Sequence, residues 1–423
     1  MAAPTIIRGS DHFFTTIYEG NGGGQKVGKF VPFTDNGTIA KSVIMDKASS
    51  PRLSRTPSSA GNRKTFTLSM WIKRCLLGSP RHMILTTSNS GGTAGDFLYF
   101  NTDNTIKFTD DDSGDYNLVT TRTFEDTSRF YHLLVAVDTT QSTASNRVKI
   151  YIDGDQITSF GTESYPAQDY DFHINNSVHP MNIFSDYGSS GSEYSDGYIA
   201  EANLVDGTAL TPSTFGLTDT STGKWIPKSL TGITYGTNGF RMQFANSAGQ
   251  TIGDDTSGNG NDYTVTNIAT TDIVTDSPTQ NHCVLSSGLS RGSVSLSEGS
   301  TKLISSAANY ACCATTMSFS ETDSQGYYFE VKVTGSTRDT TGVLIMRGSV
   351  DVNALSSNQQ HAGCFGILAR GGGGSNQYWY TSDGSYAGTT GVSHGANDVI
   401  QVAFKQGKVW FGINNTYLLS GNP

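Results

Sequence analysis

The chain has 423 residues, a formal net charge of −9, 15% charged residues and 48 glycines. Single hydrophobic cores rarely grow past about 250 residues, so this length predicts two or three domains. The negative charge and the lack of a Lys/Arg cluster exclude a nucleic-acid-binding surface, and no apolar run approaches the roughly 20 residues of a membrane-spanning helix.

Residues 1–35 form a segment of their own at the start of the chain. The opening "MAAPTIIRGSDHFF" lacks the basic and apolar regions of a secretory signal, so we expect folding in a cytoplasm. Its apolar side chains are set apart from the rest by "GNGGG", and we expect another protein chain to cover them. We therefore predict an attachment segment formed by Ile6, Ile7, Phe13, Phe14, Ile17 and Tyr18.

From residue 36 onward, short runs of alternating apolar and polar residues recur between clusters of Gly, Asn, Asp and Ser. This alternation predicts short β-strands, and strands this short need two facing sheets to bury a core. The sequence therefore predicts an all-β protein built of jelly-roll β-sandwiches. The runs are "TFTLSMWIKR", "FLYFNTDNTIKF", "YHLLVAVD", "FRMQFA", "YYFEVKVTG", "GCFGILA" and "VIQVAFK".

Two runs resemble each other across about 260 residues of sequence. "RVKIYIDGDQIT", from Arg147, and "GKVWFGINNTYLL", from Gly407, both alternate around a tight Asp-Gly or Asn-Asn turn. This pattern is typical of a β-hairpin. The repetition indicates two sandwiches of related architecture.

Residues 36–228 resemble the laminin G-like, concanavalin-type lectin fold. The landmarks are "TFTLSMWIKR" with its central Trp71, "RFYHLLVAVD", the hairpin "RVKIYIDGDQI" and the closing "GYIAEANLVDGTALTPSTFG". They follow one another in that family's order. The resemblance implies a concanavalin-like jelly roll and does not define a ligand.

Residues 229–287 then form an ordered connector, and residues 288–423 resemble the SPRY family, which is also a concanavalin-like sandwich. The segments that carry this second resemblance include "QGYYFEVKVTG", "YWYTSDGSYAG", "GANDVIQVAFK" and "GKVWFGINN". That family continues with further strands after this hairpin, so we expect the SPRY-like sandwich to be completed beyond Pro423 or by a neighbouring subunit.

The order of laminin G-like domain, connector and SPRY-like domain resembles fibre or appendage proteins of tailed bacteriophages. The resemblance implies a virion location, contacts with other virion proteins through the N-terminal segment, and a homo-oligomer, most simply a trimer. It also implies recognition of a glycan or protein on the host surface.

Concanavalin-like folds include glucanases, so the resemblance raises the question whether the sequence carries catalytic residues. The paired carboxylates of those enzymes are missing, since only Glu201 and the distant Asp206 stand in the relevant run. "GLSRG" precedes a strand and not the helix that a nucleophile elbow requires. We expect His173 and His179 to be loop residues and not metal ligands. The spacing of the five cysteines fits neither a disulfide framework nor a zinc motif. We therefore expect a protein that is not an enzyme and has no cofactor, apart from a possible Ca²⁺.

Two acidic, glycine-containing stretches are the possible calcium sites. "TDDDSGDY" places Asp110, Asp111, Asp112 and Asp115 in one turn. "GDDTSGNGNDY" supplies hard oxygen ligands from Asp254, Asp255, Asn259, Asn261 and Asp262. Neither fits the twelve-residue calcium loop, and Asp, Asn and Gly also favour turns, so calcium and a plain turn both stay open.

One aromatic stretch, "SNQYWYTSDGSY", is the candidate receptor site. Adjacent residues of a strand point to opposite faces, so one face of this run belongs to a core and the other is available to a sugar or a partner protein. The candidate contacts are Tyr378, Trp379, Tyr380 and Tyr386. Cross-strand packing is the alternative role.

Two functions follow from the sequence. The first is a non-catalytic virion protein, a phage fibre or appendage subunit that contributes to host recognition or decorates the particle. The alternative is a free or cell-surface carbohydrate-binding protein resembling a lectin.

Overall fold

The computed structural model describes residues 37–78, 80–87, 95–110, 113–186, 193–220, 222–244, 249–305, 311–320, 322, 324, 326–334, 342–346, 364–370, 376–380, 386–389 and 394–418. These residues form two compact units. Of the described residues, the first unit comprises 37–288 together with 295–304, and the second comprises 289–294 and those from 305 to 418.

The protein is all-β, as the alternation of its sequence predicts. The described helices are single 3₁₀ turns: η1 (Lys47–Ser49), η2 (Ala144–Asn146), η3 (Pro212–Thr214) and η4 (Thr270–Asp272). None of the described helices is long and apolar enough to cross a membrane.

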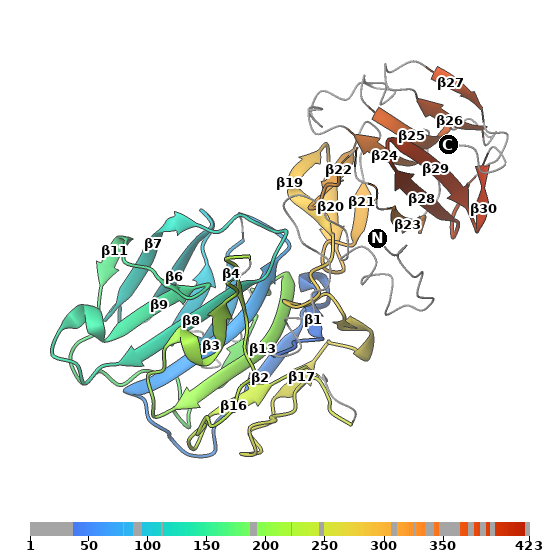
Figure 1. Ribbon diagram of the computed structural model, residues 1–423. Coiled ribbons are helices and arrows are strands. Elements are labelled where there is room, and N and C mark those ends of the chain that lie inside the picture. Colours follow the sequence, from blue (N-terminus) through green and yellow to red (C-terminus); the bar gives the residue numbers. More distant parts are fainter. Residues whose placement is uncertain are drawn as a thin grey trace. The chain divides into compact units, whose positions relative to one another are not determined.

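One face of the first unit is sheet A, which runs in the order β10-β9-β8-β3-β13-β1-β18, with β16 paired to β13 (Figure 1). Its central strand β3 lies between β13 and β8, so that Trp71 stands opposite Ala200 on one side and His132 on the other. The strands are β1 (Ser42–Met45), β3 (Thr65–Arg74), β8 (Tyr131–Asp138), β9 (Val148–Ile152), β10 (Asp155–Gln156), β13 (Gly197–Asp206), β16 (Phe240–Met242) and β18 (Ile273–Val274).

The other face is sheet B, in the order β11-β7-β6-β5-β4-β12-β2-β17. Alternate residues of the two sheets meet in one apolar core that includes Phe66, Leu98, Phe108, Ile150 and Leu204. The strands are β2 (Arg52–Arg55), β4 (His82–Thr87), β5 (Asp96–Phe100), β6 (Thr105–Asp110), β7 (Asn117–Thr123), β11 (Phe160–Ser164), β12 (Met181–Ile183) and β17 (Thr264–Thr266).

Residues 229–287, the predicted connector, contribute strands to both sheets. β16 pairs with β13, β17 pairs with β2, and β18 pairs with β1. The same stretch, together with the hairpin β14 (Gly216–Thr218) and β15 (Trp225–Pro227), covers the outer face of sheet A. This cover explains why β3 and β13 are buried along almost their whole length on both faces.

The second unit contains two four-stranded antiparallel sheets. One has the order β23-β28-β29-β30 and the other β24-β25-β26-β27. Its small core includes Val333, Ile400, Val402, Phe411 and Ile413. The strands are β23 (Tyr327–Lys332), β24 (Gly342–Met346), β25 (Cys364–Arg370), β26 (Asn376–Tyr380), β27 (Tyr386–Thr389), β28 (Val399–Lys405), β29 (Lys408–Ile413) and β30 (Thr416–Tyr417). Two further pairs of strands form two-stranded ladders. β19 (Leu285–Arg291) pairs with β22 (Cys312–Thr315), and β20 (Val294–Ser297) pairs with β21 (Lys302–Ser305).

Both predicted hairpins are present. β9 and β10 turn through Asp153 and Gly154, with φ of 53° and 87°, and β29 and β30 turn through Asn414 and Asn415, with φ of 49° and 67°. Two successive positive φ values define the turn whose twist suits a two-residue hairpin. Two features of Gly154 exclude a side chain. Its φ of 87° is one that residues with a Cβ rarely adopt, and a Cβ there would lie 2.6 Å from the ring of Trp225.

Lys73 of β3 fixes the cover over sheet A. Its fully buried ammonium donates hydrogen bonds to Asp276 Oδ2 at 2.9 Å, Asn281 Oδ1 at 3.0 Å and the carbonyl of His282 at 2.8 Å. The rings of Phe130 and Tyr198 lie 5.8 and 5.4 Å from the same nitrogen. All three donors of the ammonium are therefore satisfied by residues 276–282.

A second contact holds the β14–β15 hairpin. Trp225 Nε1 donates to His132 Nδ1 at 3.0 Å, and His132 Nε2 lies 2.9 Å from Ser69 Oγ. Since the indole N–H can only donate, Nδ1 is the acceptor and Nε2 carries the proton. The imidazole also stacks on Trp71, and burial lowers the pKa of His132 to about 3.

Replacing Lys73 by Met is expected to lower the free energy of unfolding by about 3–5 kcal/mol, because Asp276 is left buried without its counter-ion. Urea unfolding of the full chain measures this change. The matched control is Lys64→Met, which removes an exposed pair with Asp169 at 3.4 Å and should cost less than about 1 kcal/mol. Equal losses for the two variants would contradict the assignment.

His132 gives the stability a defined pH dependence. The unfolded chain binds a proton at this imidazole below pH 6.5, but the folded chain does so only below about pH 3, so stability falls as the pH falls between these values. The contribution is about 1.4 kcal/mol per pH unit. In His132→Asn, which keeps an acceptor for Trp225, the slope between pH 6 and 4 should be smaller by that amount. Trp225→Phe should lower stability without changing the slope, and parallel curves for wild type and His132→Asn would rule the effect out.

Candidate functional site

The sequence-predicted attachment residues lie outside the described residues. These are Ile6, Ile7, Phe13, Phe14, Ile17 and Tyr18, and the attachment role stays a prediction.

The aromatic candidates lie on two adjacent strands of the second unit. Tyr378, Trp379 and Tyr380 belong to β26 and Tyr386 to β27, with Tyr380 opposite Tyr386 in the ladder. The structure describes the backbone of these strands, and the side chains lie outside the described part. Their role in receptor contact stays a prediction.

The second acidic stretch forms a turn whose polar groups are used internally. Asp255 accepts hydrogen bonds from the backbone N–H groups of Arg241, Ser257 and Asn261 at 2.8–2.9 Å. Asp254 accepts from Thr251, Asp262 accepts from the N–H of Asp255, and the amides of Asn259 and Asn261 donate to carbonyls between residues 236 and 239. These bonds suit a turn former, and calcium binding here stays a prediction.

The first acidic stretch is described at Asp110 and Asp115, while Asp111 and Asp112 lie outside the described residues. Asp110 stands directly opposite Asp96 in the β5–β6 ladder. Tyr116 donates to Asp96 at 2.9 Å and Tyr170 donates to Asp110 at 3.0 Å. Burial raises the pKa of Asp96 to about 7, with a smaller contribution from Asp110. Among the described residues, no group of three or more His, Cys, Asp or Glu side chains is placed to hold a metal ion.

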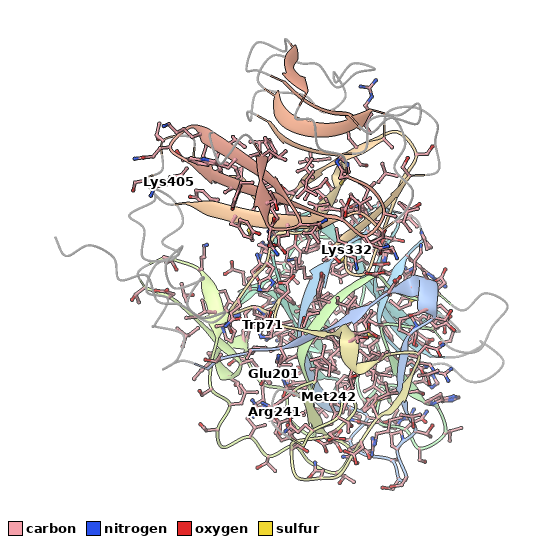
Figure 2. All side chains as sticks on the ribbon, turned by 90° about the vertical axis from the view of Figure 1, so that its right-hand side faces the viewer. Trp71, Glu201, Arg241, Met242, Lys332 and Lys405 are labelled. Carbon is pink, nitrogen blue, oxygen red and sulfur yellow. The ribbon has the colours of Figure 1, made fainter. Side chains whose placement is uncertain are left out.

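The two carboxylates of β13 have structural partners. Glu201 lies at a bulge, with φ of 41°, and its carboxylate is bound by Arg241 at 2.8 Å (Figure 2). Burial raises the pKa of Glu201, and Arg241 opposes that rise. Asp206 accepts from the N–H groups of Asn62 and Asn238 at 2.7 and 2.9 Å. Each carboxylate therefore has hydrogen-bond partners that fix it to neighbouring segments of the first unit.

A cavity of about 590 Å³ lies in the first unit, and we call it the acidic cavity. Its floor is formed by β1, β13 and β18 at one edge of sheet A, and its wall by residues 271–284 and 298–301. The lining residues are Ile44, Asp46, Tyr198, Thr271, Asp272, Val274, Asp276, His282, Cys283, Val284, Glu298 and Thr301.

Hydrogen bonds hold the wall of the acidic cavity in place. The hydroxyl of Tyr198 donates to the carbonyl of Gly299 at 2.6 Å, which fixes the turn of residues 298–301. Asp276 is fixed by Lys73 and also accepts from the N–H of His282 at 2.9 Å. Asp46 caps η1 through the N–H of Ala48 at 3.0 Å. The wall is therefore set by the fold before any ligand binds.

The charge of the acidic cavity is negative. Four carboxylates line it, and two of them are paired with cations, Asp276 with Lys73 and Glu298 with Lys302. Burial lowers the pKa of His282, so its imidazole is neutral at pH 7. The lining thus offers oxygen acceptors and hydroxyl groups beside the apolar surfaces of Ile44, Val274 and Val284. This arrangement favours neutral or cationic ligands that donate hydrogen bonds, and it disfavours anions.

Sequence reasoning missed this cavity because its lining comes from four distant parts of the chain. No short motif joins residues 44–46, 198, 271–284 and 298–301. The exposed Cys283 is one of them, whereas Cys75 is buried and burial raises the pKa of its thiol. Cys75, Cys283, Cys312 and Cys313 are free, as the sequence predicts.

The first unit contains a laminin G-like domain of the concanavalin A-like type. Residues 49–214 match a laminin G family described as the concanavalin A-like lectin/glucanases superfamily. The match confirms the laminin G-like resemblance of the first sandwich. No curated protein matches the chain significantly.

Solved structures with a similar arrangement are distant. The native heptameric SAP-like pentraxin of Limulus polyphemus is 16% identical over 41% of this chain and 80% of its own, with a TM-score of 0.31. Domain 4 of AbnA, an extracellular arabinanase of Geobacillus stearothermophilus solved with arabinotriose, is 16% identical over 38% and 68%, with a TM-score of 0.27. Trypanosoma rangeli sialidase is 15% identical over 36% of this chain and 22% of its own, with a TM-score of 0.26. Such scores carry no argument about ligand or activity.

Proposed function

We propose that this chain is a non-catalytic virion protein of a tailed bacteriophage, a fibre or appendage subunit whose first unit binds a glycan of the host surface. The observation that carries the binding role is the acidic cavity, set in the wall of a laminin G-like jelly roll. The virion setting is supported by the order of the domains in the sequence.

The size and lining of the acidic cavity support a sugar ligand. Its volume of about 590 Å³ falls within the roughly 300–1,000 Å³ of small-molecule sites. Carboxylate oxygens accept hydrogen bonds from sugar hydroxyls, while Ile44, Val274 and Val284 suit the apolar faces of a ring. The negative lining favours a neutral or amino sugar and disfavours sialic acid or phosphorylated sugars.

The arrangement of the carboxylates supports a binding role over a catalytic one. Glycoside hydrolysis requires two carboxyl groups on either side of a scissile bond, one of them free to act as acid. Glu201 is bound to Arg241 and lies outside the lining of the acidic cavity, and Asp276 is bound to Lys73. These pairings favour structural roles for both groups.

The virion role also requires partners. We propose that the N-terminal segment, residues 1–35, attaches the subunit to other virion proteins and that the subunits form a homo-oligomer, most simply a trimer. Trp379 and Tyr380 remain candidates for a second receptor contact in the SPRY-like second unit. A free or cell-surface lectin is the alternative function, and it shares the proposed sugar site.

Glycan binding is tested with the full chain on an array of neutral, amino and acidic sugars. Neutral or amino sugars should be retained, and Glu298→Lys, which reverses one charge of the cavity wall, should weaken binding at least about tenfold. Glu163→Lys, on the exposed strand β11, is the matched control and should bind normally. Equal binding by both variants, or retention of acidic sugars alone, would contradict the proposed site.

The virion role is tested separately by electron microscopy of purified particles labelled with an antibody to this chain. Labelled fibres or appendages are expected, at positions related by the symmetry of the particle. Particles without label, from cells that produce the protein, would exclude the virion role and leave the lectin function in place.

A further inference from the structure

A second, much smaller cavity lies inside the first unit, where the polar ends of three strands meet between the sheets. Its volume is about 10 Å³, and its lining includes Arg74 at the end of β3, His82 at the start of β4 and Asp196 just before β13. The apolar part of the lining includes Phe100 and Phe184. Polar groups from both sheets therefore line the same small cavity.

Each of these three polar side chains has an atom without a partner. Arg74 is 2% exposed, His82 3% and Asp196 5%, yet Arg74 Nε, both ring nitrogens of His82 and Asp196 Oδ1 have no hydrogen bond. The other guanidinium nitrogens of Arg74 are bonded, to the carbonyl of Phe124 and to Asn104 Oδ1. Buried polar atoms are rarely left unpaired in folded proteins, so unpaired atoms from three residues around one cavity point to a missing common partner.

We propose that this cavity is a binding site for one ordered water molecule, which accepts a hydrogen bond from Arg74 Nε and donates to Asp196 Oδ1 and a ring nitrogen of His82. Buried waters make about three hydrogen bonds to polar groups that have no other partner, and about 10 Å³ is close to the space that one water occupies. The water joins β3 and the start of β13 in sheet A to β4 in sheet B.

The charges around the cavity favour water over an ion. The guanidinium of Arg74 repels a cation, and the carboxyl group of Asp196, whose pKa burial raises to about 7, repels an anion in its ionised form. Burial, reinforced by Arg74 and Lys47, lowers the pKa of His82 to about 3, so the neutral imidazole keeps one nitrogen as an acceptor. A neutral molecule that both donates and accepts gives a partner to Arg74 Nε, to Asp196 Oδ1 and to one ring nitrogen of His82.

A crystal structure of the full chain at about 1.5 Å or better tests the site directly. The expected result is one density peak within hydrogen-bond distance of Arg74 Nε, Asp196 Oδ1 and a nitrogen of His82. An empty cavity with ordered walls, a direct bond between His82 and Asp196, or a metal or halide identified by its anomalous signal would overturn the proposal.

Thermal unfolding of variants gives an independent readout. His82→Phe and Asp196→Leu each remove a partner of the same water, so their combined loss of Tm should be smaller than the sum of the separate losses by at least about 2 °C. The control pair, Asp196→Leu with Lys64→Met, should be additive, because Lys64 bonds to Asp169 and does not line the cavity.

If His82→Phe does not fold, His82→Leu, which also lacks an acceptor, replaces it in the same comparison. His82→Gln is the matched variant that retains an acceptor, and its crystal should keep the water peak and most of the wild-type Tm. Additive losses for the first pair, or a water peak that persists unchanged in the double variant His82→Phe/Asp196→Leu, would show that these side chains do not hold the water.

Discussion

The buried ammonium of Lys73 is the contact on which the organisation of the first unit depends. It lies on the outer face of sheet A, and its three hydrogen-bond acceptors all come from residues 276–282. A buried charge without these acceptors would cost several kcal/mol, so the native chain must bring that segment over the sheet. Once it is there, Tyr198 is covered, Asp276 and His282 form a wall of the acidic cavity, and β3 is buried on both faces.

Much of this fold is readable in the sequence, because strands of five or more residues carry a clear alternation. "TFTLSMWIKR" is β3 and "YHLLVAVD" is β8, each with the predicted bounds, and both hairpins turn at the predicted residues. Residues 229–287 are harder to predict, since β17 and β18 have only three and two residues, too few for a periodic pattern. The burial of Lys73 is equally hard to predict. A lysine near the end of a strand is expected to be exposed unless its partner, Asp276, which lies 203 residues away in the sequence, is known.

The candidate site shows the same division between local and long-range information. The run Asp254–Asp262 is conspicuous in the sequence, and its carboxylates accept hydrogen bonds from their own turn. The acidic cavity has no local signature, since Asp46, Tyr198, Asp276 and Glu298 meet only through the folding of the sandwich. The polar residues between the sheets, Arg74, His82 and Asp196, likewise come from three separate strand ends.

Residues 264–284 belong to the cooperative structure of the first sandwich, through the pairing of β17 and β18 and the hydrogen bonds of Lys73. Native-state hydrogen exchange of the full chain, followed by NMR or by mass spectrometry of peptides, measures this most directly. Amides of β17, β18 and residues 276–282 that are hydrogen-bonded should open with the same free energy as those of β3 and β13. Opening of this segment at a free energy several kcal/mol lower, while β3 stays protected, would show instead that it is a peripheral cover that unfolds separately from the sandwich.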